Sequence, residues 1–345
     1  MTTTAAATAA AASATHLRAV LQRAVHLVPP LSSTFRKGDH GRLLIVGGSE
    51  EYTGAPYFAA LAAFRAGVDQ VHIVCHPDAA PALKSYSPNL IVHPYLEASD
   101  NVTKANVIAE RAAALIERSH CVLVGPGLSR DPLMMKTACE IIKRARSANK
   151  CIVIDADGTS AVLEDLDLIR NYERVVITPN VVEFGRVFNA AEGKNGSDPG
   201  KRTEDNVSLL SKNLHGPAIL SKGSPDCIAS APTSDSTKII TCSEPGSLRR
   251  CGGLGDILSG FVAAFMSWGH QYLAGKWTTR DGSKISESEM PLLAATASSY
   301  LARKCAARAF EVKGRSMLAD DVHEHIQTVI EQFLEQHSSE TTNKL

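Results

Sequence analysis

The segment Cys251-Gly252-Gly253-Leu254-Gly255-Asp256 leads directly into the apolar run Ile257-Leu258-Ser259-Gly260-Phe261-Val262. Three glycines within positions 252–255 let the backbone approach a ligand closely. The helix expected from Leu254 turns its free N–H groups and the positive end of its dipole toward that ligand. The segment therefore predicts a cradle for an anion at the start of a helix.

An acidic side chain, Asp256, stands at the mouth of this cradle. A carboxylate there would repel a phosphate, so its chemical use is that of a base that takes a proton from an attacking hydroxyl. The structural alternative is that Asp256 only caps the helix, since Asp is a favoured N-cap residue. Capping alone does not explain the glycines before it, and we therefore favour the base.

Outward from this segment, short apolar runs alternate with longer helical patterns. Strands apolar on both faces and separated by helices predict an α/β fold with a mainly parallel central sheet and helices on both faces. Ligands bind such sheets at the carboxyl ends of the strands. The expected strands are 42–46, 70–75, 120–124, 151–154, 174–178, 217–221, 226–230 and 238–242, the last two as a hairpin. The expected helices are 55–66, 132–145, 254–268, 291–307 and 320–334.

Composition narrows the class of partner. The chain has 345 residues, with Lys+Arg and Asp+Glu both at 36, and this balance lacks the basic excess of a nucleic-acid binder. Its longest apolar runs are strand-sized, well short of the ~20 residues of a membrane helix. Eight scattered cysteines without a Cys-x-x-Cys pair predict reduced, buried thiols. We expect a small-molecule partner, no nucleic acid and no membrane, and leave a homo-oligomer open.

The ends of the chain differ from its middle. Residues 1–14 are almost entirely Ala and Thr and are expected to form a disordered, low-complexity leader. The reduced cysteines indicate a reducing compartment, and we expect a cytoplasmic protein. The leader has some presequence character, which leaves a mitochondrial form open. Residues 15–335 are expected to form a single domain with polar surface insertions at 193–205 and 270–288. Residues 336–345 are expected to form a polar, frayed tail.

Further polar segments follow expected strands. Lys222 could meet a phosphate as a point charge, and Gly223 permits a turn, although a solvated β-turn explains both. Asp155 and Asp157 point to one face in an extended chain, which suits Mg²⁺ or a supporting role as well as helix capping. His323 and His325 are expected to be exposed helix residues. We expect no transition-metal site.

The segment from Thr178 combines a strand end, a Pro turn and a helix start. Asn180 can cap the helix with Glu183 at the capping-box position. Asn180, Glu183 and Arg186 also share one helix face, where they could meet a ligand. Glycine turns at 47–49, 54–56 and 125–127 suit loops that line a substrate. Neither a complete G-x-G-x-x-G nor a G-x-x-x-x-G-K-[ST] is present, which argues against Rossmann and Walker-type nucleotide binding.

Taken in order, these segments and the run Lys37-Gly38-Asp39-His40-Gly41-Arg42 closely resemble the NAD(P)H-hydrate dehydratase family, from about Leu17 to Leu334. The Thr-Pro-Asn and Arg-Arg-Cys-Gly-Gly forms resemble its eukaryotic, ATP-dependent branch. The resemblance implies a ribokinase-like fold and repair of the S-epimer of hydrated NADH and NADPH. ATP would phosphorylate the 6-hydroxyl, with Mg²⁺ assisting, and phosphate would then be eliminated.

The resemblance also implies roles for individual residues, with Asp256 as the catalytic base. The implied ATP-binding residues are Lys222, Gly223, Ser224, Pro225, Asp226, Gly246, Ser247, Leu248, Arg249, Arg250, Cys251, Gly252, Gly253, Leu254 and Gly255. The implied contacts to the hydrated cofactor are Gly127, Asn180, Val181, Val182, Glu183, Phe184, Gly185, Arg186 and Asp256. Ser129 is a departure, because the family often has a glycine at this place.

Two other functions are compatible with the same cradle. A small-molecule kinase of the ribokinase-like fold would share Asp256 and would leave a stable phosphorylated product. A non-catalytic nucleotide-binding module would keep its function when Asp256 is replaced by Asn. The dehydratase differs from both, because it releases phosphate and restores the reduced nicotinamide.

Overall fold

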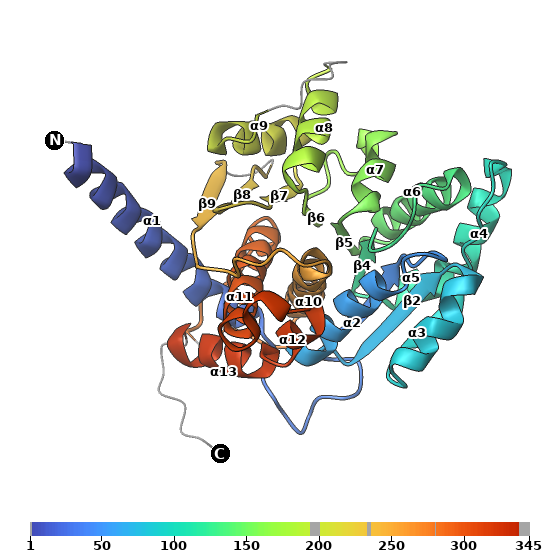
Figure 1. The fold of residues 1–345 in the computed structure, drawn as a ribbon, viewed down its shortest axis with the longest axis horizontal. Coiled ribbons are helices and arrows are strands. Elements are labelled where there is room, and N and C mark those ends of the chain that lie inside the picture. The colour runs from blue at the N-terminus through green and yellow to red at the C-terminus, as the bar shows by residue number, and fades with distance from the viewer. Residues whose placement is uncertain (1, 194–200, 233–235, 280, 338–345) are drawn as a thin grey trace.

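The protein was described from a computed structural model, which covers residues 2–193, 201–232, 236–279 and 281–337. Its nine-stranded sheet has the order β3-β2-β1-β4-β5-β6-β7-β8-β9 (Figure 1). Strands β1 to β7 pair in parallel, and β8 and β9 continue the sheet antiparallel. The bounds are β1 Arg42–Val46, β2 Gln70–Cys75, β3 Ile91–Pro94, β4 Cys121–Val124, β5 Cys151–Ile154, β6 Val175–Ile177, β7 Ala218–Ser221, β8 Asp226–Ser230 and β9 Lys238–Cys242.

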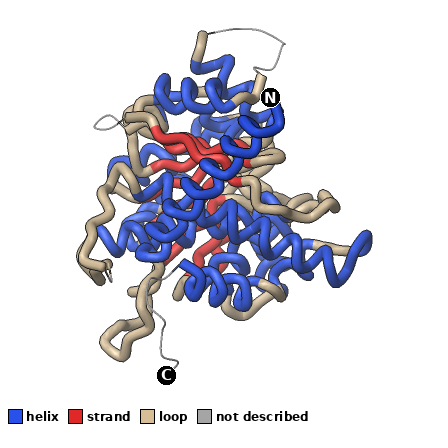
Figure 2. The backbone as a smooth tube through the Cα atoms, turned by 90° about the vertical axis from the view of Figure 1, so that its left-hand side faces the viewer, coloured by secondary structure: helices blue, strands red, loops and turns tan. Residues whose placement is uncertain are grey.

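Helices cover both faces of the sheet, so that the strands lie in the middle layer (Figure 2). One face carries α2, α10 and α11 and the other carries α6 and α8. The helices are α1 Thr2–Ala24, α2 Gly54–Ala66, α3 Ala80–Tyr86, α4 Ala105–Arg111, α5 Ala113–Arg118, α6 Pro132–Ser147, α7 Asp157–Leu163, α8 Val181–Ala191, α9 Glu204–Leu214, α10 Leu254–Leu273, α11 Met290–Lys313, α12 Ala319–His323 and α13 Ile326–His337.

The central strands are buried on both sides, as their apolar composition predicts. In β1, Leu43 and Ile45 belong to the core beneath α2 and α10, whereas Leu44 and Val46 belong to the core beneath α6. Because successive side chains of a strand alternate between faces, one apolar run supplies two cores. The predicted mainly parallel sheet with helices on both faces and the predicted hairpin of β8 and β9 are confirmed.

Two local predictions are wrong, and one strand has no prediction. Strand β3 was not predicted, since this short edge strand is partly exposed and ends in Pro94. The expected helix 320–334 is divided into α12 and α13. His323 is buried instead of exposed, because α12 packs on α2 and places its ring nitrogens 3.0 Å from the carbonyl oxygens of Ala319 and Phe58.

The N-terminal segment also differs from expectation. A helix, α1, occupies Thr2–Ala24, where the sequence predicts a disordered leader over 1–14. Alanine has the highest helix propensity, which accounts for the continuous helix. The helix docks through Leu17, Leu21 and Ala24, and its N-terminal part extends beyond the body of the fold (Figure 1). The proposed domain limits stay a prediction.

All eight cysteines are unpaired, and all but Cys251 are buried, as predicted. Within the described residues, no helix combines the length and apolarity of a membrane span. Residues 338–345 of the predicted tail, residues 194–200 of the predicted insertion 193–205 and residue 280 of the predicted insertion 270–288 lie outside the described residues.

Candidate functional site

The carboxyl ends of adjacent parallel strands bring the predicted loops to one edge of the sheet. Gly47, Gly125, Asp155, Thr178 and Lys222 each follow directly on β1, β4, β5, β6 and β7, which are neighbours in that order. This is the edge at which such sheets bind ligands. The glycine-rich segment reaches the same place, because Lys222 lies against the first turn of α10.

The start of α10 has the form of an anion cradle. Gly253 is the N-cap at φ +92°, and a Cβ atom there would fall 2.6 Å from the Cβ of Ala319, so both conformation and space require glycine. Asp256 is the third residue of the helix, and the alternative that it serves as the N-cap is therefore wrong. Gly253 has no side chain to cap the first turn, as at helix starts that bind anions through their backbone amides.

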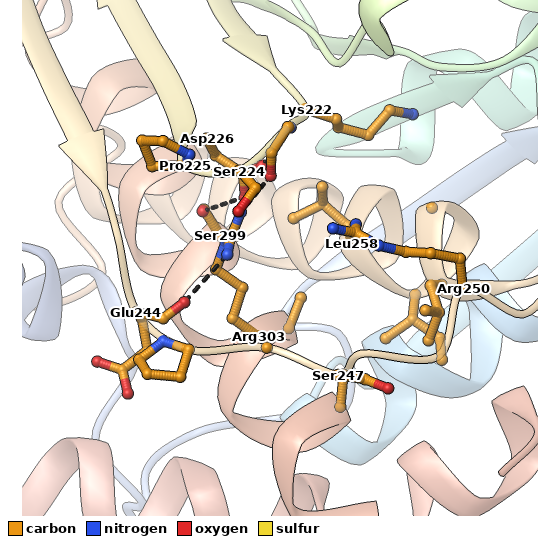
Figure 3. Close-up of a pocket in the computed structure, with 18 of the residues that line it drawn as sticks. Lys222, Ser224, Pro225, Asp226, Glu244, Ser247, Arg250, Leu258, Ser299 and Arg303 are labelled. Atoms are coloured by element: carbon orange, nitrogen blue, oxygen red, sulfur yellow. Dashed lines mark hydrogen bonds and ion pairs between the residues drawn. The ribbon is translucent and has the colours of Figure 1, made fainter. Parts of the chain in front are cut away.

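A pocket of about 540 Å³ lies beside this helix start, between the β7–β8 turn, the segment 243–251 and α11 (Figure 3). It is lined by all the residues predicted to bind ATP except Arg249, Gly252 and Gly253. Arg249 turns away, because its Nε donates a 2.7 Å hydrogen bond to the carbonyl oxygen of Met317. The pocket volume suits a ligand of drug or nucleotide size.

Two polar residues of α11, Ser299 and Arg303, also line the pocket and were not predicted. The Oδ2 atom of Asp226 accepts hydrogen bonds from Ser299 Oγ and from Arg303 Nε, both at 2.8 Å. Arg303 also donates to the backbone carbonyls of Gly223 and Glu244, and so joins two walls of the pocket (Figure 3). Asp226 is consequently a buried organiser of the turn, and its Oδ1 accepts from the amide of Gly223 at 2.7 Å.

Replacing Arg303 tests this organisation. Arg303→Lys keeps the charge but loses the planar fork that reaches Asp226 and two carbonyl groups at once. For the ATP that the sequence resemblance implies as ligand, we expect KM to rise about tenfold with a smaller change in kcat. Steady-state kinetics with varied ATP measures both. Arg308→Lys on the same helix is the control, since Arg308 binds Gln332 instead of the pocket. An unchanged KM for ATP in Arg303→Lys would contradict the assignment.

Lys222 stands among three carboxylates on the other side of the pocket. Its Nζ lies 2.8 Å from Asp155 Oδ1, and its side chain is 21% exposed against 1% for Asp155. Burial opposes the charge of Lys222, but Asp155, Glu183 and Asp256 outweigh burial and raise its pKa. Lys222 is therefore a permanent cation at the start of α10.

Asp256 has the ionisation behaviour expected of a base at neutral pH. Burial raises the pKa of Asp256 to about 7, the charge of Asp155 adds to this effect, and the charge of Lys222 opposes it. A general base is most effective when its pKa lies near the working pH. The site thus sets a proton acceptor beside an anion cradle and a fixed ammonium group.

The residues predicted to contact the hydrated cofactor divide into two groups. Asn180 caps α8 by accepting from the amides of Val182 and Glu183, and Glu183 accepts from the amide of Asn180 at 2.8 Å. The capping box is therefore present, while Val181, Val182 and Arg186 are exposed. Phe184 and Gly185 are buried, and Phe184 packs in the core on Phe188. The structure does not bring these two to the ligand-accessible surface.

The loops after β1 and β4 lie at the same edge of the sheet, on the side of β5 away from β7 and Lys222. Gly127 adopts φ +62°, and its carbonyl accepts a 3.0 Å hydrogen bond from the amide of Gly48. A Cβ atom on Gly127 would fall 2.5 Å from the carbonyl oxygen of Tyr52. Ser129 also has a positive φ, +70°, which is a conformation that glycine adopts more readily.

A metal centre built from protein side chains alone is absent from the described residues. No three His, Cys, Asp or Glu side chains among them come together in a metal-binding group. One oxygen of Asp155 is already paired with Lys222. Magnesium bound with a nucleotide needs only one or two protein carboxylates besides the phosphates. These side chains fit a magnesium ion that enters on nucleotide phosphates better than one held by protein alone.

Comparison with known proteins places this geometry in context. Residues 43–328 match the family model described as NAD(P)H-hydrate dehydratase. The chain is 42% identical over 309 residues to the ATP-dependent (S)-NAD(P)H-hydrate dehydratase of Batrachochytrium dendrobatidis, covering 87% of this chain and 93% of that protein.

Solved structures resemble the fold. A ribokinase-like superfamily protein from Enterococcus faecalis has a TM-score of 0.68 at 17% identity, covering 92% of this chain and 94% of that one. The ADP/ATP-dependent NAD(P)H-hydrate dehydratase from Bacillus subtilis, co-crystallised with ATP/Mg²⁺, has a TM-score of 0.60 at 17% identity, covering 90% and 97%. The ribokinase-like fold implied by the sequence resemblance is confirmed.

Proposed function

The chain belongs to the NAD(P)H-hydrate dehydratase family, and from this premise we propose that it uses ATP to dehydrate the S-epimer of hydrated NADH and NADPH. The products are NAD(P)H, ADP and phosphate. One observation carries the proposal. A base, Asp256, whose pKa burial raises to about 7, lies at the start of α10 together with the amides of that turn and the ammonium group of Lys222.

The site supports a reaction in two stages. Asp256 accepts the proton of the 6-hydroxyl group, whose oxygen attacks the γ-phosphorus as the bond to ADP breaks. The first-turn amides of α10 and Lys222 stabilise the negative charge of the transferring group. Phosphate then leaves with the electrons of the C–O bond, supported by the ring nitrogen. Loss of a proton from the neighbouring ring carbon restores the double bond.

The two substrates occupy opposite sides of Lys222 in this proposal. ATP takes the 540 Å³ pocket, with its phosphates toward Gly255 and Lys222. The hydrated cofactor lies toward Gly127 and the exposed face of α8. Mg²⁺ bound to the phosphates of ATP would neutralise part of their charge, and no residue of this chain is assigned as its ligand. The unpaired cysteines support a reducing compartment such as the cytoplasm.

The base makes the reaction depend on pH. Asp256 accepts a proton only when ionised, and burial holds its pKa at about 7. We therefore expect kcat/KM to rise with pH through about 7 and to level off above it. A kcat/KM profile at saturating Mg²⁺ measures this acid limb. A profile that is flat between about pH 6 and about pH 8 would contradict the role of Asp256.

The fate of the phosphate separates this function from a kinase of the same fold. The protein is incubated with hydrated NADH, ATP and Mg²⁺, and the products are separated. We expect free phosphate in step with ADP and no phosphorylated dinucleotide that persists. An accumulating phosphorylated product without free phosphate would favour the kinase and overturn the proposal.

A further inference from the structure

Asp155 is the least exposed charged side chain in the candidate site. It follows β5 directly, with 1% of its side chain exposed. Its Oδ1 atom accepts from Thr178 Oγ1 at 2.7 Å and from Lys222 Nζ at 2.8 Å. A buried carboxylate of this kind requires such partners, because an unpaired one is costly in the interior. The pairing couples the ends of three neighbouring strands, β5, β6 and β7.

The backbone around Asp155 is built for close approach. Gly125 lies so near that a Cβ atom there would fall 1.8 Å from the carbonyl oxygen of Asp155. The next residue, Ala156, has φ +47° and ψ −125°, a conformation that favours glycine. Strain of this kind persists where the surrounding structure fixes a residue and is concentrated at functional sites. The backbone that carries the Asp155 side chain is therefore held in one place.

Lys222 carries this constraint to the start of α10. Its Nζ lies 3.5 Å from the position that a Cβ atom on Gly255 would take, the residue immediately before Asp256. Figure 3 shows the Lys222 side chain extending away from Asp226 and Arg303, the opposite wall of the pocket. A four-carbon side chain is flexible, so an ammonium group at this point needs an anchor. Asp155 is the anchor that the hydrogen bonds identify.

We propose that Asp155 is a positioning residue that holds the ammonium group of Lys222 against the first turn of α10, beside Asp256, for phosphoryl transfer. The proposal rests on the proposed function and adds a residue to it. Asp155 touches neither the transferring phosphate nor the hydroxyl in this account and acts through Lys222. The alternative is a purely structural ion pair, whose removal would affect stability alone.

Asp155 and Lys222 act on the pKa of Asp256 in opposite directions. The charged groups that face Asp256 are Asp155 after β5 and Lys222 after β7, and Glu183 on α8 acts on Lys222. The helices α2 and α12 contribute the apolar Phe58 and Ala319 next to Gly253. Neutralising Asp155 removes a negative neighbour that raises the pKa of Asp256. Release of Lys222 would in turn remove a positive neighbour that lowers this pKa, so the two effects on the acid limb oppose each other. The coupling of kcat between Asp155 and Lys222 separates the two roles instead, because a purely structural ion pair does not change kcat of the folded protein.

Asp155→Asn tests the proposal. We expect kcat of the folded protein to fall about 100-fold at neutral pH, because the ammonium group of Lys222 is no longer held at the start of α10. Asp39→Asn is the matched control, since it breaks a 3.0 Å pair with Lys276 far from the site and should keep wild-type kcat. A wild-type kcat in the folded variant together with a lowered unfolding midpoint would overturn the positioning role.

A double-mutant cycle checks that Asp155 acts through Lys222. In the Lys222→Met background, adding Asp155→Asn should change kcat by no more than about twofold, because the group to be positioned is absent. Losses of kcat that multiply independently would contradict the proposal.

Asp155→Glu serves if Asp155→Asn does not fold. It keeps the charge but displaces the carboxylate, and it should also lower kcat. Wild-type kcat in Asp155→Glu would overturn positioning, whereas a wild-type protein unable to restore NADH would overturn the proposed function instead.

Discussion

Asp256→Asn is expected to lower kcat by about 10³- to 10⁴-fold while ATP binding is largely retained. Asn has the shape of Asp but cannot accept the hydroxyl proton, so the loss falls on the chemical step. The ATP pocket is untouched, because it lies between the β7–β8 turn and α11. Single-turnover kinetics measures the chemical step, and calorimetric titration measures ATP binding.

The stability of the same variant separates catalysis from folding. Burial raises the pKa of Asp256 from 3.8 to about 7, so the ionised carboxylate costs stability as pH rises through this window. Asn carries no charge to bury, so the unfolding midpoint of the variant at neutral pH should be no lower than that of the wild type. Asp320→Asn, which removes an exposed carboxylate from α12, is the control for turnover. Wild-type turnover in Asp256→Asn would contradict the mechanism.

The second large effect is expected from Gly125→Ala. The added Cβ atom would fall 1.8 Å from the carbonyl oxygen of Asp155 and 2.6 Å from the amide nitrogen of Gly158, and φ at this position is +125°. Backbone atoms cannot move aside as side-chain ends do. We expect the free energy of unfolding to fall by about 3 kcal/mol or more, with activity lost in the folded fraction, because Asp155 is displaced. Urea denaturation and steady-state kinetics measure the two effects.

Gly275→Ala provides the matched comparison for this prediction. Gly275 also has a positive φ, +78°, but nothing lies within 4 Å of its hypothetical Cβ. The substitution should cost only the conformational penalty, about 1 kcal/mol, and leave activity unchanged. The difference in the free energy of unfolding between Gly125→Ala and Gly275→Ala measures the effect of the close approach of Gly125 to Asp155. Equal losses of stability would show that this approach is not required.

The sequence predicts most of what lies at the centre of the sheet. Apolar runs such as 42–46 and 151–154 are strands with the expected bounds, because a strand buried on both faces needs apolar residues throughout. The short edge strand β3 lacks that requirement and was missed. The cradle at the start of α10 was predicted from local sequence, since its glycines and its helix are adjacent in the chain.

Contacts between distant segments could not be predicted. Arg303 is one of many charged residues in a helical pattern, and its partner Asp226 lies 77 residues earlier. The ion pair of Asp155 and Lys222 spans 67 residues. Phe184 is a different case, because its place in a motif suggested a ligand contact whereas its ring is buried in the core beside Phe188 of the same helix. Tertiary packing, which a single sequence does not reveal, decides each of these cases.

The most direct test of the proposed function is the absorbance of reduced nicotinamide when ATP is added to the protein with the S-epimer of hydrated NADH and Mg²⁺. We predict that absorbance is restored only after ATP is added, in step with the release of ADP and phosphate, and that Asp256→Asn shows almost none of this increase. Consumption of ATP without any restored absorbance would contradict the dehydratase function.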